Sequence, residues 1–155
     1  MGLDMYLETE VSLFELRTGD PHLLRIRDVI KREFDGLFEP DNDFIGATVT
    51  IPLAYWRKAN AIHRWFVENV QDDKDDCQRS HVSLEQLKTL RTTCAAVLTD
   101  RDTAAVRLPT QKGFYFGDTD YNDYYFSHLE YTVKALDRVI DGIWPSMEIY
   151  YHASW

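Results

Sequence analysis

The apolar residues of this chain change their spacing several times, and this alternation limits the fold more than any other feature of the sequence. Residues 2–14 alternate between apolar and polar positions, whereas residues 48–56 and 147–155 are rich in β-branched and aromatic residues. Both patterns are typical of strands. Pro52 lies inside the middle stretch and lacks a backbone N–H, so we expect that strand at a sheet edge, at a bulge or with Pro52 near its end.

Four other stretches repeat apolar residues every three or four positions, which is typical of helices that pack on a core. Asp20 and Pro21 form an N-cap and first-turn pair, and Ser83 and Gln86 have the spacing of a capping box. The predicted helices cover residues 21–36, 56–70, 84–99 and 129–143. The predicted fold class is α+β, with about four helices packed on a small, antiparallel sheet of about three strands. With 155 residues, of which 45% are hydrophobic, the chain is expected to form a single globular domain over residues 1–155.

The composition excludes several classes of partner and site. A formal net charge of −9 repels polyanions, so duplex DNA and an anionic membrane are not expected as partners. Cys77 and Cys94 lack the spacing of a zinc or redox motif, and Cys94 lies on the apolar face of a predicted helix, where we expect it in the core. The acidic run 71–76 lacks the glycine and the closing glutamate of a calcium loop, so we expect a solvated loop and no metal site.

The cellular location and the need for a cofactor are predicted from segments and motifs that the sequence lacks. The N-terminus carries Asp4 where a secretory signal would be basic, and no apolar stretch of 18 residues occurs, which favours the cytoplasm. No motif predicts a cofactor.

Residues 55–66, which read YWRKANAIHRWF, concentrate cations and aromatic rings at the junction of a predicted strand and a predicted helix. Unpaired amides at a helix start would add to the charges of Arg57 and Lys58 and favour an anion such as phosphate. The alternative for these two cations is a solvated helix start. The aromatic residues beside them can stack on a planar base, and for them the alternative is packing in the core.

Residues 108–126, which read LPTQKGFYFGDTDYNDYYF, combine glycines with aromatic and hydrogen-bonding residues. Gly113 and Gly117 permit turns or the close approach of a ligand, but the Lys-Ser or Lys-Thr pair of a phosphate loop is missing. If this loop folds over residues 55–66, the two segments form a phosphate clamp with a stacking wall. The predicted ligand-binding residues are Tyr55, Trp56, Arg57, Lys58, His63, Thr110, Gln111, Phe114 and Phe116.

His63 lies at the edge of the apolar face of the predicted helix 56–70, where a buried structural role and a catalytic role are both open. If the chain were an enzyme, His63 would serve as its general base or acid, and no other catalytic residue is predicted. Asp4, Asp76 and Cys77 are candidate partners for it by residue type. Because no Ser-His-Asp order and no HExxH motif occurs, we expect a binding protein rather than an enzyme.

Four longer motifs, two of which lie in the segments 55–66 and 108–126, are specific as sequences. They are GLDMYL at 2–7, YWRKANAIH-x-WF from 55, DDC at 75–77 and LPTQ-x-GF-x-FG from 108. Together they resemble a family of small bacteriophage and prophage proteins for which no catalytic residues are established. The resemblance covers nearly the whole chain and implies a phage gene product that acts in the host cytoplasm, and phage accessory genes of this size often counter host defences.

Three functions are compatible with these features. The first is a binding module that sequesters a nucleotide-derived signal of a host immune system. In it, Arg57, Lys58 and Gln111 would hold polar groups of the ligand, and Trp56 and Phe114 would stack on the base. The first alternative is an acidic inhibitor that docks on a basic host defence or nucleic-acid-binding protein, and the second is a nucleotide-processing enzyme. Exposed aromatic residues are also compatible with a homodimer.

Overall fold

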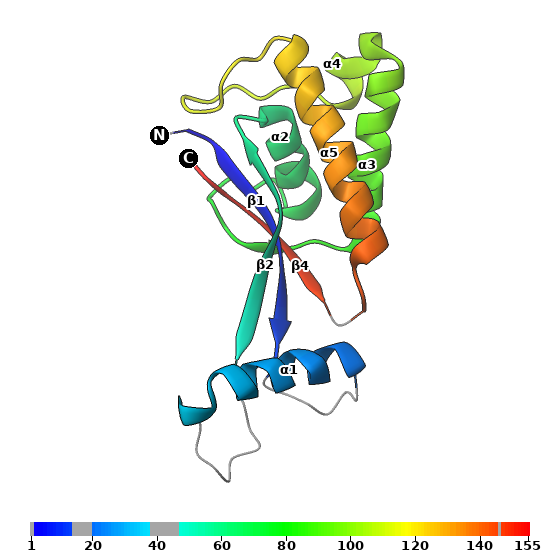
Figure 1. Cartoon of the computed structure of the whole chain (residues 1–155). Helices are drawn as coiled ribbons and strands as arrows, with labels where there is room; N and C mark the ends of the chain where they lie inside the picture. Colours follow the sequence, from blue (N-terminus) through cyan, green and yellow to red (C-terminus); the bar gives the residue numbers. More distant parts are fainter. Residues whose placement is uncertain (1, 14–19, 38–46, 146) are drawn as a thin grey trace.

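In the computed structural model, the described residues are 2–13, 20–37, 47–145 and 147–155. Four strands form one antiparallel sheet in the order β2-β1-β4-β3 (Figure 1). The strands are β1 (Asp4–Ser12), β2 (Thr48–Arg57), β3 (Ser80–His81) and β4 (Glu148–Ser154). The three predicted strands and their antiparallel arrangement are confirmed. The fourth, β3, has two residues and therefore carries no periodic pattern that a sequence could reveal.

Five α-helices complete the described part of the chain, which confirms the α+β fold class but not the number of about four. The helices are α1 (Pro21–Glu33), α2 (Asn60–Val70), α3 (Leu84–Thr99), α4 (Ala104–Arg107) and α5 (Asp123–Gly142). Short 3-10 turns occupy Asp35–Leu37 and Arg101–Thr103. The helix that the sequence missed is α4, which consists of a single turn and is too short for apolar periodicity.

The helix starts that carry a capping motif lie where the sequence places them. The side chain of Asp20 accepts a hydrogen bond from the backbone of His22 at the start of α1. At the start of α3, both hydrogen bonds of the box formed by Ser83 and Gln86 are present. These caps are local interactions, so they can be read from a few neighbouring residues.

Two other helix starts differ from the prediction. Helix α2 begins at Asn60 and not near residue 56, because Arg57 still belongs to β2 and Lys58 turns the chain with a positive φ of 57°. The backbone N–H of Lys58 donates to the carbonyl of Leu3, which anchors the turn on the segment before β1. Helix α5 begins at Asp123, six residues before its first apolar position in the pattern, because the side chain of Asn122 caps it.

The position of Pro52 agrees with the prediction for its strand. Strand β2 lies at the edge of the sheet, and Pro52 pairs with Glu8 next to a register shift between Leu7 and Glu8. A proline lacks a backbone donor, so an edge with a local irregularity accommodates it without an unpaired acceptor in the ladder.

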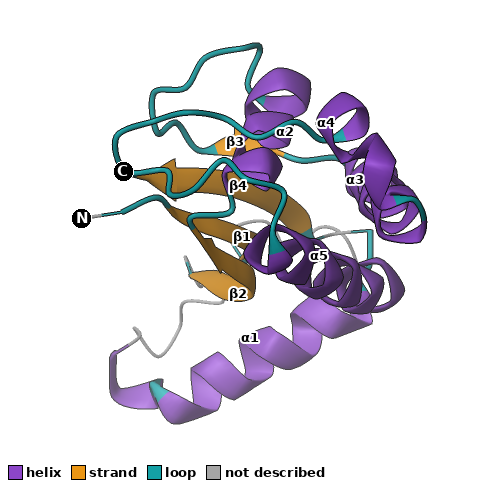
Figure 2. Ribbon diagram, turned by 90° about the horizontal axis from the view of Figure 1, so that it is seen from above, coloured by secondary structure: helices purple, strands orange, loops and turns teal. Residues whose placement is uncertain are grey.

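The main core lies between one face of the sheet and the helices α2, α3 and α5 (Figure 2). Alternate residues of β1 are buried on this face, among them Met5 and Leu7, and α3 packs against α5. Cys94 is fully buried here, as predicted, and burial raises the pKa of its thiol to about 12. Both cysteines are free thiols. Among the described residues, no helix combines the length and the apolar character needed to cross a bilayer.

A second, smaller core lies at the far end of the β1–β2 pair, where α1 crosses the strands (Figure 1). Val11, Leu13 and Leu23 are buried in it. The ring of His22 stacks on Trp144 at a centroid distance of 4.7 Å, which connects α1 with the segment after α5. This end of the molecule lies away from the loop 108–122, which approaches the start of α2 at the opposite end.

Candidate functional site

A pocket of about 370 Å³ lies at the N-terminal end of α2, between this helix, the loop 117–122 and the first turns of α5. Its volume is within the range of small-molecule sites. The apolar part of its wall includes Ala59, Ala61, Ile62 and Leu129. The remaining lining residues, polar or aromatic except for Gly117, are Arg57, Lys58, Asn60, Thr110, Gly117, Asp118, Asp120, Asn122, Tyr124, Tyr125 and His128.

The side chain of Asn60 holds the loop against the start of α2. Its Nδ2 donates to the carbonyl oxygens of Phe116 at 3.0 Å and Asp118 at 2.7 Å, and its Oδ1 accepts from the backbone N–H of Gln111 at 3.2 Å. Both amide protons and the amide oxygen are therefore used, as a buried carboxamide requires. Asn60 is only 4% exposed. This one residue therefore fixes both ends of the segment 111–118 and the wall of the pocket.

The first amides of α2 have no acceptor among the described residues. The N-cap position is Ala59, whose side chain cannot accept a hydrogen bond, and the first amide with a partner is that of His63, which donates to the carbonyl of Ala59 at 3.0 Å. The amides of Asn60 and Ala61 precede it, and both residues line the pocket. Unpaired amides and the positive end of the helix dipole favour a negatively charged group at this end of the pocket.

Two cations lie at the same end. Arg57 is exposed, and its Nε is 3.8 Å from Oδ1 of Asp4, a long and solvent-accessible contact. Lys58 makes no ion pair within the described residues, and its side chain runs over Gly117. A Cβ added at Gly117 would lie 3.1 Å from Cβ of Lys58, and the φ of +85° also favours glycine there. The group that approaches Gly117 closely is thus the side chain of Lys58.

The opposite wall is formed by the loop and α5. Asp118 is held in place, because its carboxylate accepts from the backbone N–H of Asp120 and from Nδ2 of Asn122. Asp120 has no comparable side-chain contact among the described residues, so its carboxylate can accept a hydrogen bond from a ligand. The ring of Tyr124 is 77% exposed, which leaves it free to stack.

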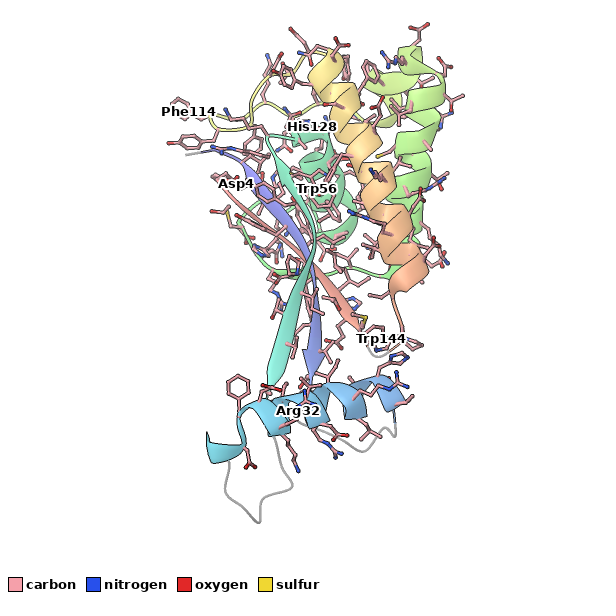
Figure 3. All side chains as sticks on the ribbon, in the orientation of Figure 1. Asp4, Arg32, Trp56, Phe114, His128 and Trp144 are labelled. Carbon is pink, nitrogen blue, oxygen red and sulfur yellow. The ribbon has the colours of Figure 1, made fainter. Side chains whose placement is uncertain are left out.

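His128 extends from α5 into the same region, as Figure 3 shows, and is half-buried. Burial lowers its pKa, so this imidazole is neutral at pH 7 in the absence of a ligand. Its ring nitrogens have no hydrogen-bond partner among the described residues, so His128 can donate to a ligand or accept from it.

A second pocket, of about 280 Å³, lies on the other side of the loop. It is lined by Asp75, Gln111, Lys112, Gly113, Phe114, Tyr115, Phe116 and Trp155. Gly113 is required here, because a Cβ at this position would lie 2.5 Å from the ring of Phe116. The run 71–76 was expected to be a solvated loop, but Asp75 is partly buried in this pocket and makes specific contacts with side chains from other segments.

His63 lies in the interior and lines neither of these pockets. It is 0% exposed, its Nδ1 is 2.7 Å from the hydroxyl of Tyr151, and its Nε2 is 3.0 Å from Oδ1 of Asp75. The acidic partner is therefore Asp75. Neither Asp4 nor Asp76, which the sequence suggested, nor Cys77 has a contact with His63 among the described interactions; Asp4 instead accepts a short hydrogen bond from Tyr55.

The predicted ligand-binding residues are divided by the structure into three groups. Arg57, Lys58 and Thr110 line the larger pocket, whereas Gln111, Phe114 and Phe116 line the smaller one. Tyr55, Trp56 and His63 line neither.

The residues outside both pockets have other partners. Trp56 is 2% exposed, and its Nε1 donates to Oγ1 of Thr132 at 2.9 Å, so its ring packs in the core (Figure 3). The backbone N–H of Tyr55 donates to the hydroxyl oxygen of Tyr131 at 3.2 Å, and the ring of Tyr55 is tilted against that of Tyr6. In contrast to the buried Trp56, Phe114 is 93% exposed and lies at the outer edge of its loop (Figure 3).

Sequence reasoning missed Asn60, Asp75, Tyr124 and His128. Asn60 was visible as the single amide in the segment between Lys58 and His63, but its position at the first turn was not, because the predicted helix began near residue 56. His128 and Asp75 gave no such signal, because each contributes through residues that are distant in the sequence. Among the described residues, no group of three or more His, Cys, Asp or Glu side chains could hold a metal ion.

Comparisons with models of protein families, with curated proteins and with solved structures found no match for this chain.

Proposed function

We propose that the larger pocket binds a small anion of the nucleotide class and that the protein holds this ligand without converting it. The proposal rests on the N-terminal end of α2, where backbone amides without an acceptor line the pocket together with Arg57 and Lys58. A phosphate at this end would receive backbone hydrogen bonds, dipole stabilisation and two positive charges.

The rest of the pocket favours a ligand larger than inorganic phosphate. A volume of about 370 Å³ and a wall that includes Ala61, Ile62 and Leu129 suit a planar organic group beside the anion. The exposed ring of Tyr124 can stack on a base, an interaction worth about 1–3 kcal/mol. Asp120 lies on the same wall and can accept a hydrogen bond from an exocyclic amino group of that base.

Binding without turnover fits the placement of the histidines. His63 would be the general base or acid of an enzyme, but both of its ring nitrogens have partners in the interior. Of the described residues around the pocket, His128 is the only histidine, and no carboxylate contacts its ring to orient it. A nucleotide-processing enzyme would therefore depend on His128, and recovery of a chemically altered ligand would favour that function.

The resemblance of the sequence motifs to phage proteins suggests the biological role of this binding. Sequestration of a nucleotide-derived immune signal in the host cytoplasm would counter a host defence without any catalytic step. The alternative, an acidic inhibitor that docks on a host defence or nucleic-acid-binding protein, requires a stable protein complex and no ligand in the pocket. A homodimer is compatible with either function.

Native mass spectrometry after incubation with an extract of phage-infected cells separates these functions. A bound nucleotide that is recovered with unaltered mass after denaturation is the expected result. The double variant Arg57→Ala, Lys58→Ala should lose the ligand and keep its thermal midpoint, because both side chains are exposed. The control Lys134→Ala, Arg138→Ala removes the same charge from exposed positions of α5 and should retain the ligand. Equal retention by both double variants, or an empty wild-type protein, would contradict the proposal.

A further inference from the structure

Asp75 carries a negative charge that no cation of the described residues neutralises. Its Oδ1 accepts from Nε2 of His63 and from Nε1 of Trp155, each at 3.0 Å. Its Oδ2 has only a long contact of 3.5 Å with Nε2 of Gln111. The side chain is 22% exposed, and no lysine or arginine of the described residues forms an ion pair with it. One carboxylate oxygen therefore has capacity for a further partner.

The three contacts of Asp75 come from neutral groups. An ionised carboxylate can only accept, so the hydrogen of His63 lies on Nε2, and Nδ1 accepts from the hydroxyl of Tyr151. Burial lowers the pKa of His63, and this outweighs the opposite influence of Asp75. Burial also keeps Tyr151 protonated, since it raises the pKa of this hydroxyl well above its ordinary value. The chain Tyr151, His63, Asp75 thus orients the carboxylate without cancelling its charge.

The pocket that Asp75 lines has several aromatic side chains in its wall. Trp155 is 44% exposed, and its ring meets that of Phe116 edge-on at a centroid distance of 5.9 Å. Phe114 and Tyr115, which line the same pocket, also pack edge-on, at a centroid distance of 4.8 Å. A cation between aromatic faces and a carboxylate is stabilised by the ring quadrupoles and by direct charge attraction.

We infer that the smaller pocket binds an organic ammonium ion, with its positive charge beside Oδ2 of Asp75 and its alkyl groups against Trp155 and Tyr115. The volume of about 280 Å³ suits a small alkylammonium group. Lys112 also lines this pocket, is exposed and makes no ion pair within the described residues. The positive charge of Lys112 therefore opposes the binding of a second cation in this pocket. This site is separate from the proposed nucleotide pocket and does not depend on it.

Titration calorimetry with choline, and with its uncharged isostere 3,3-dimethylbutan-1-ol, tests this inference. Choline is expected to bind saturably, and the alcohol at least tenfold more weakly, because only choline carries the charge. Asp75→Asn should weaken choline binding at least tenfold, since the amide oxygen can still accept from His63 and Trp155 but the charge is lost. The matched control is Asp76→Asn, an exposed neighbour that should bind choline as the wild type does.

Two further variants keep the test decisive if Asp75→Asn folds poorly. Lys112→Ala should tighten choline binding, because it removes a positive charge from the pocket wall, and Trp155→Ala should weaken choline binding by removing one aromatic side chain. Arg57→Ala with Lys58→Ala should leave choline binding unchanged, which separates this site from the nucleotide pocket. Equal binding of choline and the alcohol, unchanged binding by Asp75→Asn, or no saturable binding of choline would overturn the inference.

Discussion

Replacing Asn60 by alanine should destabilise the protein and release the loop that separates the two pockets. The substitution removes three hydrogen bonds at once, to the carbonyls of Phe116 and Asp118 and from the amide of Gln111. No other side chain of the described residues bonds to these three backbone groups. Because residues of this loop line both pockets, Asn60→Ala should also weaken ligand binding in each pocket.

The expected loss follows from the surroundings of the three backbone groups. Asn60 is 4% and Phe116 is 5% exposed, so the carbonyl of Phe116 would stay buried without a donor. A buried unsatisfied group costs about 1–3 kcal/mol, and the half-buried amide of Gln111 falls toward the lower end of that range. Asp118 is exposed, so water can replace its lost bond at little cost. We therefore expect a loss of about 2–4 kcal/mol in the free energy of unfolding.

Urea denaturation measures this loss, and Asn69→Ala is the matched control. For a chain of this size, a slope of about 2 kcal/mol per molar urea turns the loss into a midpoint shift of about 1–2 M. Asn69 lies on the same helix, is exposed, and makes one side-chain bond, to the carbonyl of Trp65, so its removal should change stability by no more than about 0.5 kcal/mol. If Asn60→Ala lost no more stability than Asn69→Ala, the assigned role of Asn60 would be refuted.

Three further predictions concern the second pocket and the network behind it. Gly113→Ala should lower the free energy of unfolding by about 1–3 kcal/mol, because the new Cβ would lie 2.5 Å from the ring of Phe116. The control Gly142→Ala should not, because a Cβ there would have nothing within 4 Å. Equal thermal midpoints of the two variants would contradict this prediction. Tyr151→Phe should cost about 1–3 kcal/mol in chemical denaturation, because Nδ1 of His63 loses its buried donor, and a neutral result would exclude that bond. Burial lowers the pKa of His63, so the imidazole binds a proton more tightly in the unfolded state than in the folded state. The free energy of unfolding should therefore fall as the pH drops below about 6.5, by at most about 1.4 kcal/mol per pH unit for this group. His63→Gln should reduce that slope, and identical slopes would show that the residue does not titrate on unfolding.

The parts of the fold that were predicted from the sequence depend on local interactions. The starts of α1 and α3 follow from Asp20 and from the box of Ser83 and Gln86, because a cap lies within four residues of the groups it satisfies. The edge position of β2 follows from Pro52 for a similar reason, since the missing N–H is a property of one residue.

The start of α2 could not be predicted correctly, because it depends on a distant contact. The apolar pattern continues through Trp56 into the helix, yet Arg57 belongs to β2 and Lys58 adopts a positive φ with its N–H bonded to Leu3. Periodicity cannot distinguish the end of a strand from the beginning of a helix when both bury the same side of the chain.

The candidate site was predicted only in part, for the same physical reason. Arg57 and Lys58 were identified by their charge next to a helix start, which is a local property. Asp75 was expected in solvent, because its neighbours in the sequence are acidic, whereas its contacts come from His63 and Trp155. Asp75 and Trp155 are 80 residues apart in the sequence, so no local sequence pattern can predict their contact.

The most direct test of the proposed function is an NMR titration of the ¹⁵N-labelled protein with adenosine monophosphate, with inorganic phosphate as the reference ligand. The account predicts saturable shifts of the backbone amide signals of Asn60, Ala61 and Gly117, with tighter binding of the nucleotide than of phosphate. Unchanged signals at these positions under saturating nucleotide, or shifts confined to other parts of the chain, would contradict a nucleotide site at the start of α2.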